Sequence, residues 1–276
     1  MADDFDGLHS HLRAVSCVYG PETWDLYAVL DQSIGPRGPD LMHNWALEHL
    51  TPQSVILDAG CRDAVHLIRL VQASGATGSG VDPVERLVEA ARHAVADAGL
   101  DDRIQIIRGA MQNLPYPDQY FDFLWCRDVL EVVEGLEAAL AEAGRVLRPG
   151  GHAVVYTVFA TDLLEPKEAA LLERNLAVVA ANLKEKAVED AFARAQLIVV
   201  SKDVIGTEWR EYVEEQTQPV SRDLLRLARL RRQSSRIIQQ FGQDIYDHVQ
   251  SNLHWQVYQF LGKLQPTLYL LRKAEN

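Results

Sequence analysis

The sequence predicts an α/β fold in which a mostly parallel, Rossmann-like sheet carries helices on both faces. Between residues 51 and 160, short apolar segments typical of buried strands alternate with helical segments. The first two apolar segments each end in an aspartate, Asp58 and Asp82. Alternating strands and helices build a parallel sheet whose strands end at one edge, and ligands of such sheets bind at that edge.

The predicted strands are short apolar runs. They span residues 54–58, 78–82, 104–107, 121–125, 153–158, 196–204 and 267–271. The predicted helices span residues 64–73, 84–98, 136–147, 163–183, 186–195, 221–241 and 244–261. Residues 148–151 contain a proline and two glycines, so we expect the helix before them to end there.

One integrated domain with three parts is expected. Residues 1–50 form an N-terminal helical lid with a glycine and proline break near residue 35, and residues 51–160 form a cofactor-binding core. Residues 161–276 supply the rest of the sheet, with a helical cap inserted before the last strand. The cap and the N-terminal helices are expected to enclose a substrate together.

Composition excludes several classes of function. The net charge of −12 argues against a nucleic-acid partner, because phosphate binding needs a basic surface. Cys17, Cys61 and Cys126 lack the spacing and the companion histidines of a zinc site, so no metal site is predicted. No apolar run approaches the ~18 residues that span a bilayer, and no secretory signal is visible. We therefore expect a cytoplasmic protein that acts without a membrane, and whether it forms a homodimer stays open.

The strongest candidate for a binding site is the turn from Asp58 through Gly60. Gly60 permits a tight turn and a close backbone approach, and the following helix N-terminus favours an anion. Asp82, about two dozen residues later, can accept hydrogen bonds from both hydroxyls of a ribose. Each feature alone also fits an ordinary loop glycine or a helix N-cap. Their combination and spacing favour nucleotide binding.

Residues 54–159 resemble the core of class I S-adenosylmethionine-dependent methyltransferases. The matching segments are residues 55–60, 80–82, 114–118, 121–122, 128–131 and 145–151. The resemblance implies methyl transfer to a small-molecule substrate with S-adenosylmethionine as cofactor. It also implies a set of cofactor-binding residues around the methionine, ribose and adenine. These are Asp58, Gly60, Cys61, Arg62, Asp82, Pro83, Ala110, Met111, Gln112, Cys126 and Arg127.

The sequence departs from the family pattern at three places. Arg62 and Ala64 stand where the family's turn has glycines, and Ala110 stands where an acidic residue commonly follows the glycine. Val132 replaces a histidine that is often near the substrate. Arg62 suits either a pairing with the cofactor carboxylate or a structural salt bridge.

Aromatic residues of the expected lid and cap predict a mostly apolar substrate pocket, although core packing explains any one of them as well. They are Tyr19, Trp24, Tyr27, Trp209, Tyr212, Trp255 and Tyr258. Arg127 is a candidate substrate ligand as well as a cofactor ligand. Six arginines fall between residues 222 and 236, and Arg226 is the candidate substrate ligand among them. They suit a diphosphate, or alternatively a solvated helix face paired with acids.

The C-terminal half is also similar to bacterial geranyl diphosphate C-methyltransferases. The similarity lies in residues 126–128, 165–168 and 206–210. It implies methylation of an isoprenoid diphosphate at carbon, with Mg²⁺ accompanying the diphosphate. Trp209 is then a pocket wall of the catalytic site, and Glu168 is the base that takes the proton. Two alternatives stay open: O- or N-methylation of a secondary metabolite, and a methyltransferase fold repurposed for another reaction or for binding.

Overall fold

The structure is a computed structural model that describes residues 2–275 and divides into two units, Met1–Pro36 and Arg37–Asn276. The first unit contains α1 (Ala2–Val18) and α2 (Pro21–Leu30). A proline begins α2, where its missing N–H costs no helical hydrogen bond. None of the side chains described at residues 9–36 is buried, so these residues form no apolar core.

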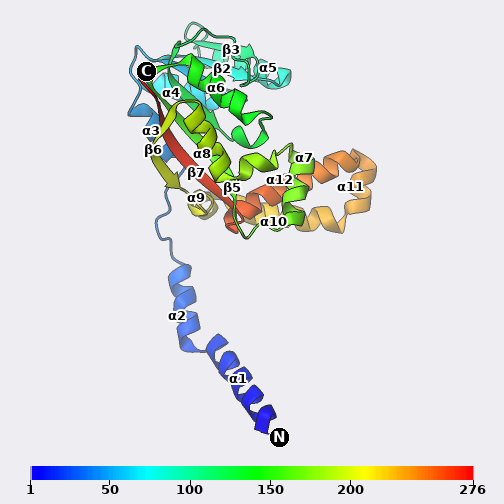
Figure 1. Ribbon diagram of the computed structural model, residues 1–276. Coiled ribbons are helices and arrows are strands. Elements are labelled where there is room, and N and C mark those ends of the chain that lie inside the picture. The colour runs from blue at the N-terminus through cyan, green and yellow to red at the C-terminus, as the bar shows by residue number, and fades with distance from the viewer. Residues whose placement is uncertain (1, 276) are drawn as a thin grey trace. The chain divides into compact units, whose positions relative to one another are not determined.

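The second unit is built on a seven-stranded sheet in the order β3-β2-β1-β4-β5-β7-β6 (Figure 1). The strands are β1 (Val55–Ala59), β2 (Thr77–Asp82), β3 (Ile104–Arg108), β4 (Phe121–Arg127), β5 (Leu147–Ala160), β6 (Leu197–Val204) and β7 (Leu264–Lys273). The first five strands pair in parallel, whereas β7 runs antiparallel to both β5 and β6. The predicted mostly parallel α/β fold is confirmed.

Helices connect these strands and follow them. They are α3 (Asp40–Leu47), α4 (Val65–Ser74), α5 (Glu85–Asp97), α6 (Leu136–Val146), α7 (Pro166–Leu176), α8 (Glu185–Arg194), α9 (Glu208–Thr217), α10 (Pro219–Arg232), α11 (Ser234–Phe241) and α12 (Gln243–Phe260). Two short 3₁₀ segments are η1 (Leu130–Val132) and η2 (Ala180–Leu183). None of the helices between residues 2 and 275 is long and apolar enough to cross a membrane.

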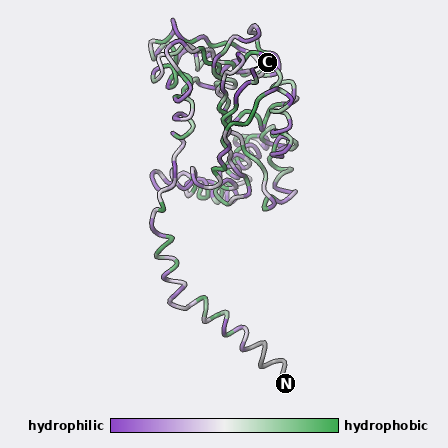
Figure 2. Tube along the Cα trace, turned by 60° about the vertical axis from the view of Figure 1, so that its left-hand side comes forward, coloured by the Kyte–Doolittle hydropathy of each residue, from purple (hydrophilic) through white to green (hydrophobic). Residues whose placement is uncertain are grey.

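Strand alternation builds a core on each face of the sheet. Ile56 and Leu57 are neighbours on β1, point to opposite faces and belong to separate apolar clusters. The Ile56 cluster includes residues of α3, α4, α5 and α12, and the Leu57 cluster includes residues of α6 and α8. Hydropathy along the chain shows hydrophobic segments running through the sheet (Figure 2). Helices α10, α11 and α12 share a third, smaller cluster.

Several boundaries differ from the sequence predictions. The predicted helix at 163–183 ends at Leu176, because Ala177 adopts a left-handed conformation with φ 55°. The predicted helix at 221–241 is two helices, α10 and α11, interrupted at Gln233. Helix α9 was not predicted, and β5 begins at Leu147, so residues 148–151 belong to a strand.

Helix α3 lies within the predicted 1–50 lid, yet it packs against α4 and β5. Met42, His43 and Ala46 are buried on its inner face. The helix therefore contributes to the core of the second unit. The enclosing role of the lid as a whole stays a prediction.

Candidate functional site

A cavity of about 510 Å³ lies where β1, β2, β3 and β4 end, at the predicted edge of the sheet. Its lining includes ten of the eleven predicted cofactor residues: Asp58, Gly60, Cys61, Arg62, Asp82, Pro83, Ala110, Met111, Gln112 and Arg127. The exception is Cys126, a residue of β4 whose side chain is completely buried in the core. The fold therefore gathers residues from four separate chain segments around one space.

The turn after β1 keeps a backbone shape that normally requires glycine. Gly60 has φ +83°, and a Cβ atom there would clash with the side chain of Val129. Arg62 and Ala64, which replace the family's glycines, have φ values of 49° and 57°. Both occupy the left-handed region that side chains disfavour. The turn thus retains its conformation at the cost of backbone strain.

Asp82 connects this turn to the end of β2. Its Oδ2 accepts a hydrogen bond from the backbone N–H of Arg62 at 3.0 Å, and its Oδ1 accepts one from Val84 at 2.9 Å. The backbone N–H groups of Gly60 and Cys61 donate to the carbonyl of Val81. Since a carboxylate can accept about four hydrogen bonds, Asp82 keeps acceptor capacity for a ligand in the cavity.

Asp58 is a buried carboxyl group on the cavity wall. Burial, with Asp82 and Asp63 nearby, raises its pKa to about 8. Its side chain has no hydrogen-bond partner within the part of the chain that the structure describes. A buried carboxyl group without a partner favours a ligand that supplies hydrogen-bond donors or positive charge.

Two roles are predicted for Arg62, a pairing with the cofactor carboxylate and a structural salt bridge. The structure contains the salt bridge. The guanidinium of Arg62 pairs with Asp63 at 3.1 Å, and both side chains are largely exposed.

Gln112 also lines the cavity, and its side-chain amide donates a hydrogen bond to the backbone carbonyl of Glu134 at 2.7 Å. This bond fixes the orientation of the loop that follows β3.

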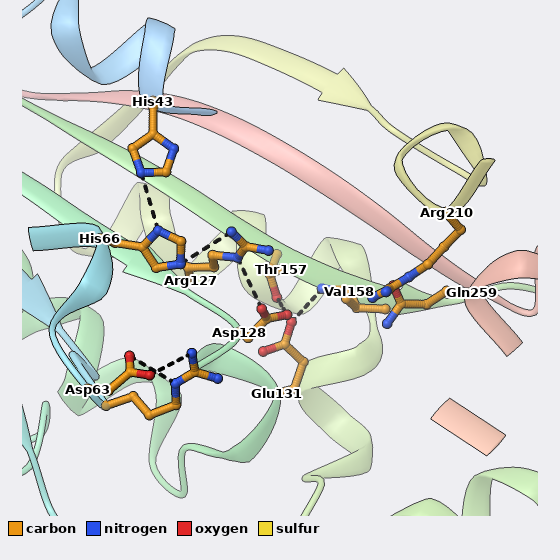
Figure 3. A network of polar contacts seen from close by, with 11 residues as sticks. His43, Asp63, His66, Arg127, Asp128, Glu131, Thr157, Val158, Arg210 and Gln259 are labelled. Atoms are coloured by element: carbon orange, nitrogen blue, oxygen red, sulfur yellow. Dashed lines mark hydrogen bonds and ion pairs between the residues drawn. The ribbon is translucent and has the colours of Figure 1, made fainter. Parts of the chain in front are cut away.

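Sequence reasoning missed His66 and Trp125, which also line the cavity. Figure 3 shows His66 between His43 and Arg127. Nδ1 of His66 lies 3.2 Å from Nε2 of His43, and its Nε2 lies 3.3 Å from Nη1 of Arg127. The rings of both histidines pack against Trp125, with centroids 4.7 and 5.3 Å away. No spacing in the sequence could have indicated this cluster, because its members lie on α3, α4 and β4.

Glu131 is a second buried carboxyl group near the site. Its Oε1 accepts hydrogen bonds from the Thr157 hydroxyl at 2.9 Å and the Val158 backbone at 2.6 Å. Its Oε2 is buried without a partner in the described chain. Burial, with the charge of Asp128 as a smaller cause, raises the pKa of Glu131 above its usual range.

The predicted substrate residues lie outside the lining of the 510 Å³ cavity, apart from Arg127. Trp209 is the one connected to it. Its ring stacks on Tyr156 with centroids 5.0 Å apart, and the Arg127 guanidinium lies 6.0 Å from it. Tyr212 packs against Gly38. Trp255 is half-buried against the core, and Tyr258 is buried.

The remaining predicted substrate residues are exposed. Arg226 lies on the outer face of α10 and pairs with Asp223 at 2.9 Å. The other arginines of α10 are exposed as well. Tyr19, Trp24 and Tyr27 belong to the N-terminal unit, where more than half of each side chain is exposed.

Glu168, the predicted base, lies in the first turn of α7. Its Oε2 accepts a hydrogen bond from the Glu165 backbone at 3.0 Å, which forms a capping box. Lys263 donates to both of its carboxylate oxygens at 2.6 Å. Burial raises the pKa of Glu168, but the hydrogen bonds from Lys263 and Glu165 outweigh it and lower the pKa. Glu168 is therefore ionised at neutral pH.

Known proteins with similar sequences identify the core. Residues 57–155 match the family described as a methyltransferase domain. This segment includes the turn after β1, Asp82 and the end of β4. The match supports the predicted resemblance of this segment to the class I S-adenosylmethionine-dependent methyltransferases. The segment runs from within β1 to within β5 and includes every residue that lines the cavity.

Two curated methyltransferases have sequences similar to this domain. Methyltransferase GfsG of Streptomyces halstedii is 30% identical over 118 residues, 43% of this chain and 42% of that protein. The 27-O-demethylrifamycin SV methyltransferase of Amycolatopsis mediterranei is 34% identical over 97 residues, 35% of this chain and 36% of that protein. The chain therefore matches less than half of the length of these relatives.

Solved structures share the fold over most of the chain. The (4+2) cyclase SpnF has a TM-score of 0.67 at 17% identity, covering 86% of this chain and 81% of that one. Geranyl diphosphate C-methyltransferase from Streptomyces coelicolor A3(2) has a TM-score of 0.63 at 14% identity, covering 85% and 78%. At these identities the likeness shows the fold alone.

Proposed function

We propose that this protein transfers the methyl group of S-adenosylmethionine to a small, largely apolar metabolite. The observation that carries the proposal is the pairing of Asp82 with the strained turn around Gly60 on one cavity wall. The family of residues 57–155 supports methyl transfer independently. The activity of the whole protein rests on this proposal, since its relatives match only in part.

The residues on the cavity wall fit the cofactor. Gly60 lets the backbone approach the ligand, and the partnerless Asp58 suits a cationic amino group. Asp82 is placed to accept hydrogen bonds from ribose hydroxyls, while its bond to Arg62 holds the turn. When bound, S-adenosylmethionine supplies an electrophilic methyl group. The protein's part is chiefly to align the nucleophile and to exclude water.

The substrate we propose is an isoprenoid diphosphate that is methylated at carbon. The stacked pair Trp209 and Tyr156 supports this choice, because aromatic faces stabilise developing positive charge. Glu168 is the candidate base, as a mostly buried and ionised carboxylate. A fold shared with a geranyl diphosphate C-methyltransferase is consistent with it.

Mg²⁺ would accompany such a diphosphate. Within residues 2–275 no group of three or more histidine, cysteine or acidic side chains is placed to hold a metal ion. The diphosphate oxygens and water would therefore supply most of the ligands of the ion, since Mg²⁺ usually keeps several waters when it binds substrate phosphates.

A transfer assay tests the proposal and separates it from the alternatives. The protein is incubated with methyl-tritiated S-adenosylmethionine and either geranyl diphosphate with Mg²⁺ or a panel of phenols and amines. Label in the prenyl product supports carbon methylation, whereas label only in the panel favours O- or N-methylation. S-adenosylhomocysteine binding without any label transfer would overturn the methyltransferase proposal. The assay is needed because a cyclase shares this fold.

A further inference from the structure

Arg127 presents unused hydrogen-bond donors at the cavity wall. Its Nε donates to Asp128 at 3.3 Å, and its Nη1 donates to His66 at 3.3 Å. A guanidinium has five N–H bonds, and the other three of Arg127 have no partner within residues 2–275. The side chain is 25% exposed and lines the cavity. Arg127 therefore has donors available for a ligand.

The histidine contacts of Arg127 have a defined direction (Figure 3). A guanidinium can only donate, so Nε2 of His66 is the acceptor and the ring proton of His66 sits on Nδ1. That Nδ1–H donates to Nε2 of His43 at 3.2 Å. The proton of His43 is then on Nδ1, which is buried without a partner in the described chain. The lone pair on Nε2 of His66 thus orients the guanidinium of Arg127.

Both histidines are neutral at physiological pH. Burial, followed by the charge of Arg127, lowers the pKa of His66 to about 3. Burial, followed by the charges of Arg69 and Arg127, lowers the pKa of His43 to about 4. A neutral imidazole accepts the hydrogen bond without cancelling positive charge, which a carboxylate in its place would do. His66 is also unsuited to be a catalytic base, because its lone pair is already occupied.

Aromatic rings fix the other side of Arg127. Its guanidinium carbon lies 5.4 Å from the Tyr156 ring and 6.0 Å from the Trp209 ring. Contacts of this kind stabilise a cation without pairing its charge. Asp128 touches only Nε, and half of its side chain is exposed, so it screens the guanidinium only in part. The charge of Arg127 is thus positioned by groups that leave most of it available.

The arginines of α10 do not offer a comparable site. They lie on an exposed helix face, and Arg226 already pairs with Asp223. None of them lines the cavity. Arg127 is instead the arginine next to both the cavity and the stacked pair of Trp209 and Tyr156.

We propose that Arg127, held by the neutral pair His66 and His43, binds an oxyanion group of the substrate, a phosphate or a carboxylate. The proposal rests on the proposed function, because it assigns the site to the substrate of methyl transfer. His66 and His43 act as positioning residues through Arg127. An anion bound there lies beside the aromatic pair that would contact the apolar part of the molecule.

The experiment uses the full chain, first alone and then with S-adenosylhomocysteine at saturation. Inorganic pyrophosphate is titrated by ³¹P NMR and ¹³C-labelled acetate by ¹³C NMR, so that the two sources of an oxyanion are compared. S-adenosylhomocysteine affinity is measured in parallel by calorimetry. Arg127→Gln is the test variant, and Arg194→Gln, an exposed arginine on α8, is the matched control. Arg226→Gln tests the competing helix.

We expect Arg127→Gln to weaken the preferred probe about tenfold or more, as for a charged hydrogen bond, and to change the S-adenosylhomocysteine affinity clearly less than that. His66→Leu should weaken the probe several-fold at an unchanged melting temperature. His66→Gln, whose amide oxygen can accept from Arg127, should restore it.

The inference would be overturned if neither probe bound to the wild-type protein, if Arg127→Gln bound the probe equally well, or if the loss were confined to Arg226→Gln. Loss of S-adenosylhomocysteine affinity in Arg127→Gln as large as the loss of the probe would also overturn it, because Arg127 would then serve the cofactor. If the wild-type protein fails to bind S-adenosylhomocysteine, the proposed function fails, whereas the probe titration still reports on Arg127.

Discussion

Asp82 accepts a hydrogen bond from the backbone N–H of Arg62 at 3.0 Å, which ties the end of β2 to the turn after β1. The two residues are twenty positions apart in the chain. One carboxylate therefore shapes the turn and faces the cavity that the turn borders. A change at Asp82 will affect ligand contact and loop geometry together.

Asp82→Ala should weaken S-adenosylhomocysteine binding by about tenfold to a hundredfold, the loss of a charged hydrogen bond. Asp82→Asn keeps one acceptor for the Arg62 N–H and should lose less. Calorimetry measures both, with Asp190→Asn, an exposed aspartate on α8, as the control. If Asp82→Ala kept the wild-type affinity for S-adenosylhomocysteine, the cofactor would not bind at this edge of the sheet.

Arg62→Gly should make the protein equally or more stable by up to about 1 kcal/mol, because glycine adopts a positive φ without the left-handed penalty. The Arg62–Asp63 ion pair that is lost is exposed and contributes little. Arg62→Ala removes the same ion pair but keeps the strained conformation, so it is the matched control. In denaturant unfolding, the free energy of unfolding of Arg62→Gly should exceed that of Arg62→Ala. The reverse order would show that the backbone at residue 62 is not strained.

The contribution of Asp58 to stability should fall as pH rises from about 4 to 8. Its pKa is about 8 when folded and 3.8 as its ordinary value, so over this range the folded state keeps a proton that the unfolded chain has lost. The contribution is fully present below pH 4 and lost through pH 8. Asp58→Asn removes this contribution, so the melting temperature of the variant relative to that of the wild type should rise between pH 5 and 8. A difference that does not change with pH would show that Asp58 is ionised in the fold.

Trp209 should limit the length of the apolar substrate. Trp209→Phe keeps an aromatic ring against Tyr156 but is smaller, so longer prenyl diphosphates should be accepted in the transfer assay. Trp209→Ala empties more space, and we expect it to cost about 3–5 kcal/mol of stability as well. If a folded Trp209→Phe protein keeps the wild-type preference for chain length, Trp209 is a core residue only.

Glu168→Gln should lower turnover of geranyl diphosphate by about 10²–10⁴-fold with cofactor affinity unchanged, as expected for a lost base. Glu165→Gln is the matched control on the same helix start, since a glutamine oxygen can still cap the helix. If the Glu168→Gln enzyme kept near-normal turnover but had a lower melting temperature, Glu168 would not be the base. Its role would then be to stabilise the fold through its hydrogen bonds with Lys263 and Glu165.

The fold could be predicted from local patterns. Every predicted strand is present, because short apolar runs between turn residues are visible within a few positions. The breaks at Ala177 and Gln233 could not be predicted, since neither residue type signals a helix end. Helix α9 is short and rich in glutamate, so it lacks a strong apolar period.

The site was predictable where it depends on the chain around β1 and β2, and not where tertiary contacts create it. Gly60 and Asp82 are identified by their positions at strand ends. His43 and His66 are 23 positions apart, and His66 and Arg127 are 61 apart, so only the packing of α3 on α4 and β4 reveals their contact. The sequence shows that Arg62 and Ala64 depart from the family pattern, but only their φ angles show that the backbone keeps a left-handed bend at both positions.

The place of β7 has a consequence for how the chain reaches its native state. It lies between β5 and β6, although residues 264–273 are synthesised well after both of them. Until β7 arrives, the facing edges of β5 and β6 have unpaired backbone groups on apolar strands, which invites pairing with other chains. The long sequence separation also makes this pairing a slow step. The interval between the synthesis of β6 and the pairing of β7 is thus the period in which the partly folded chain is most prone to aggregate.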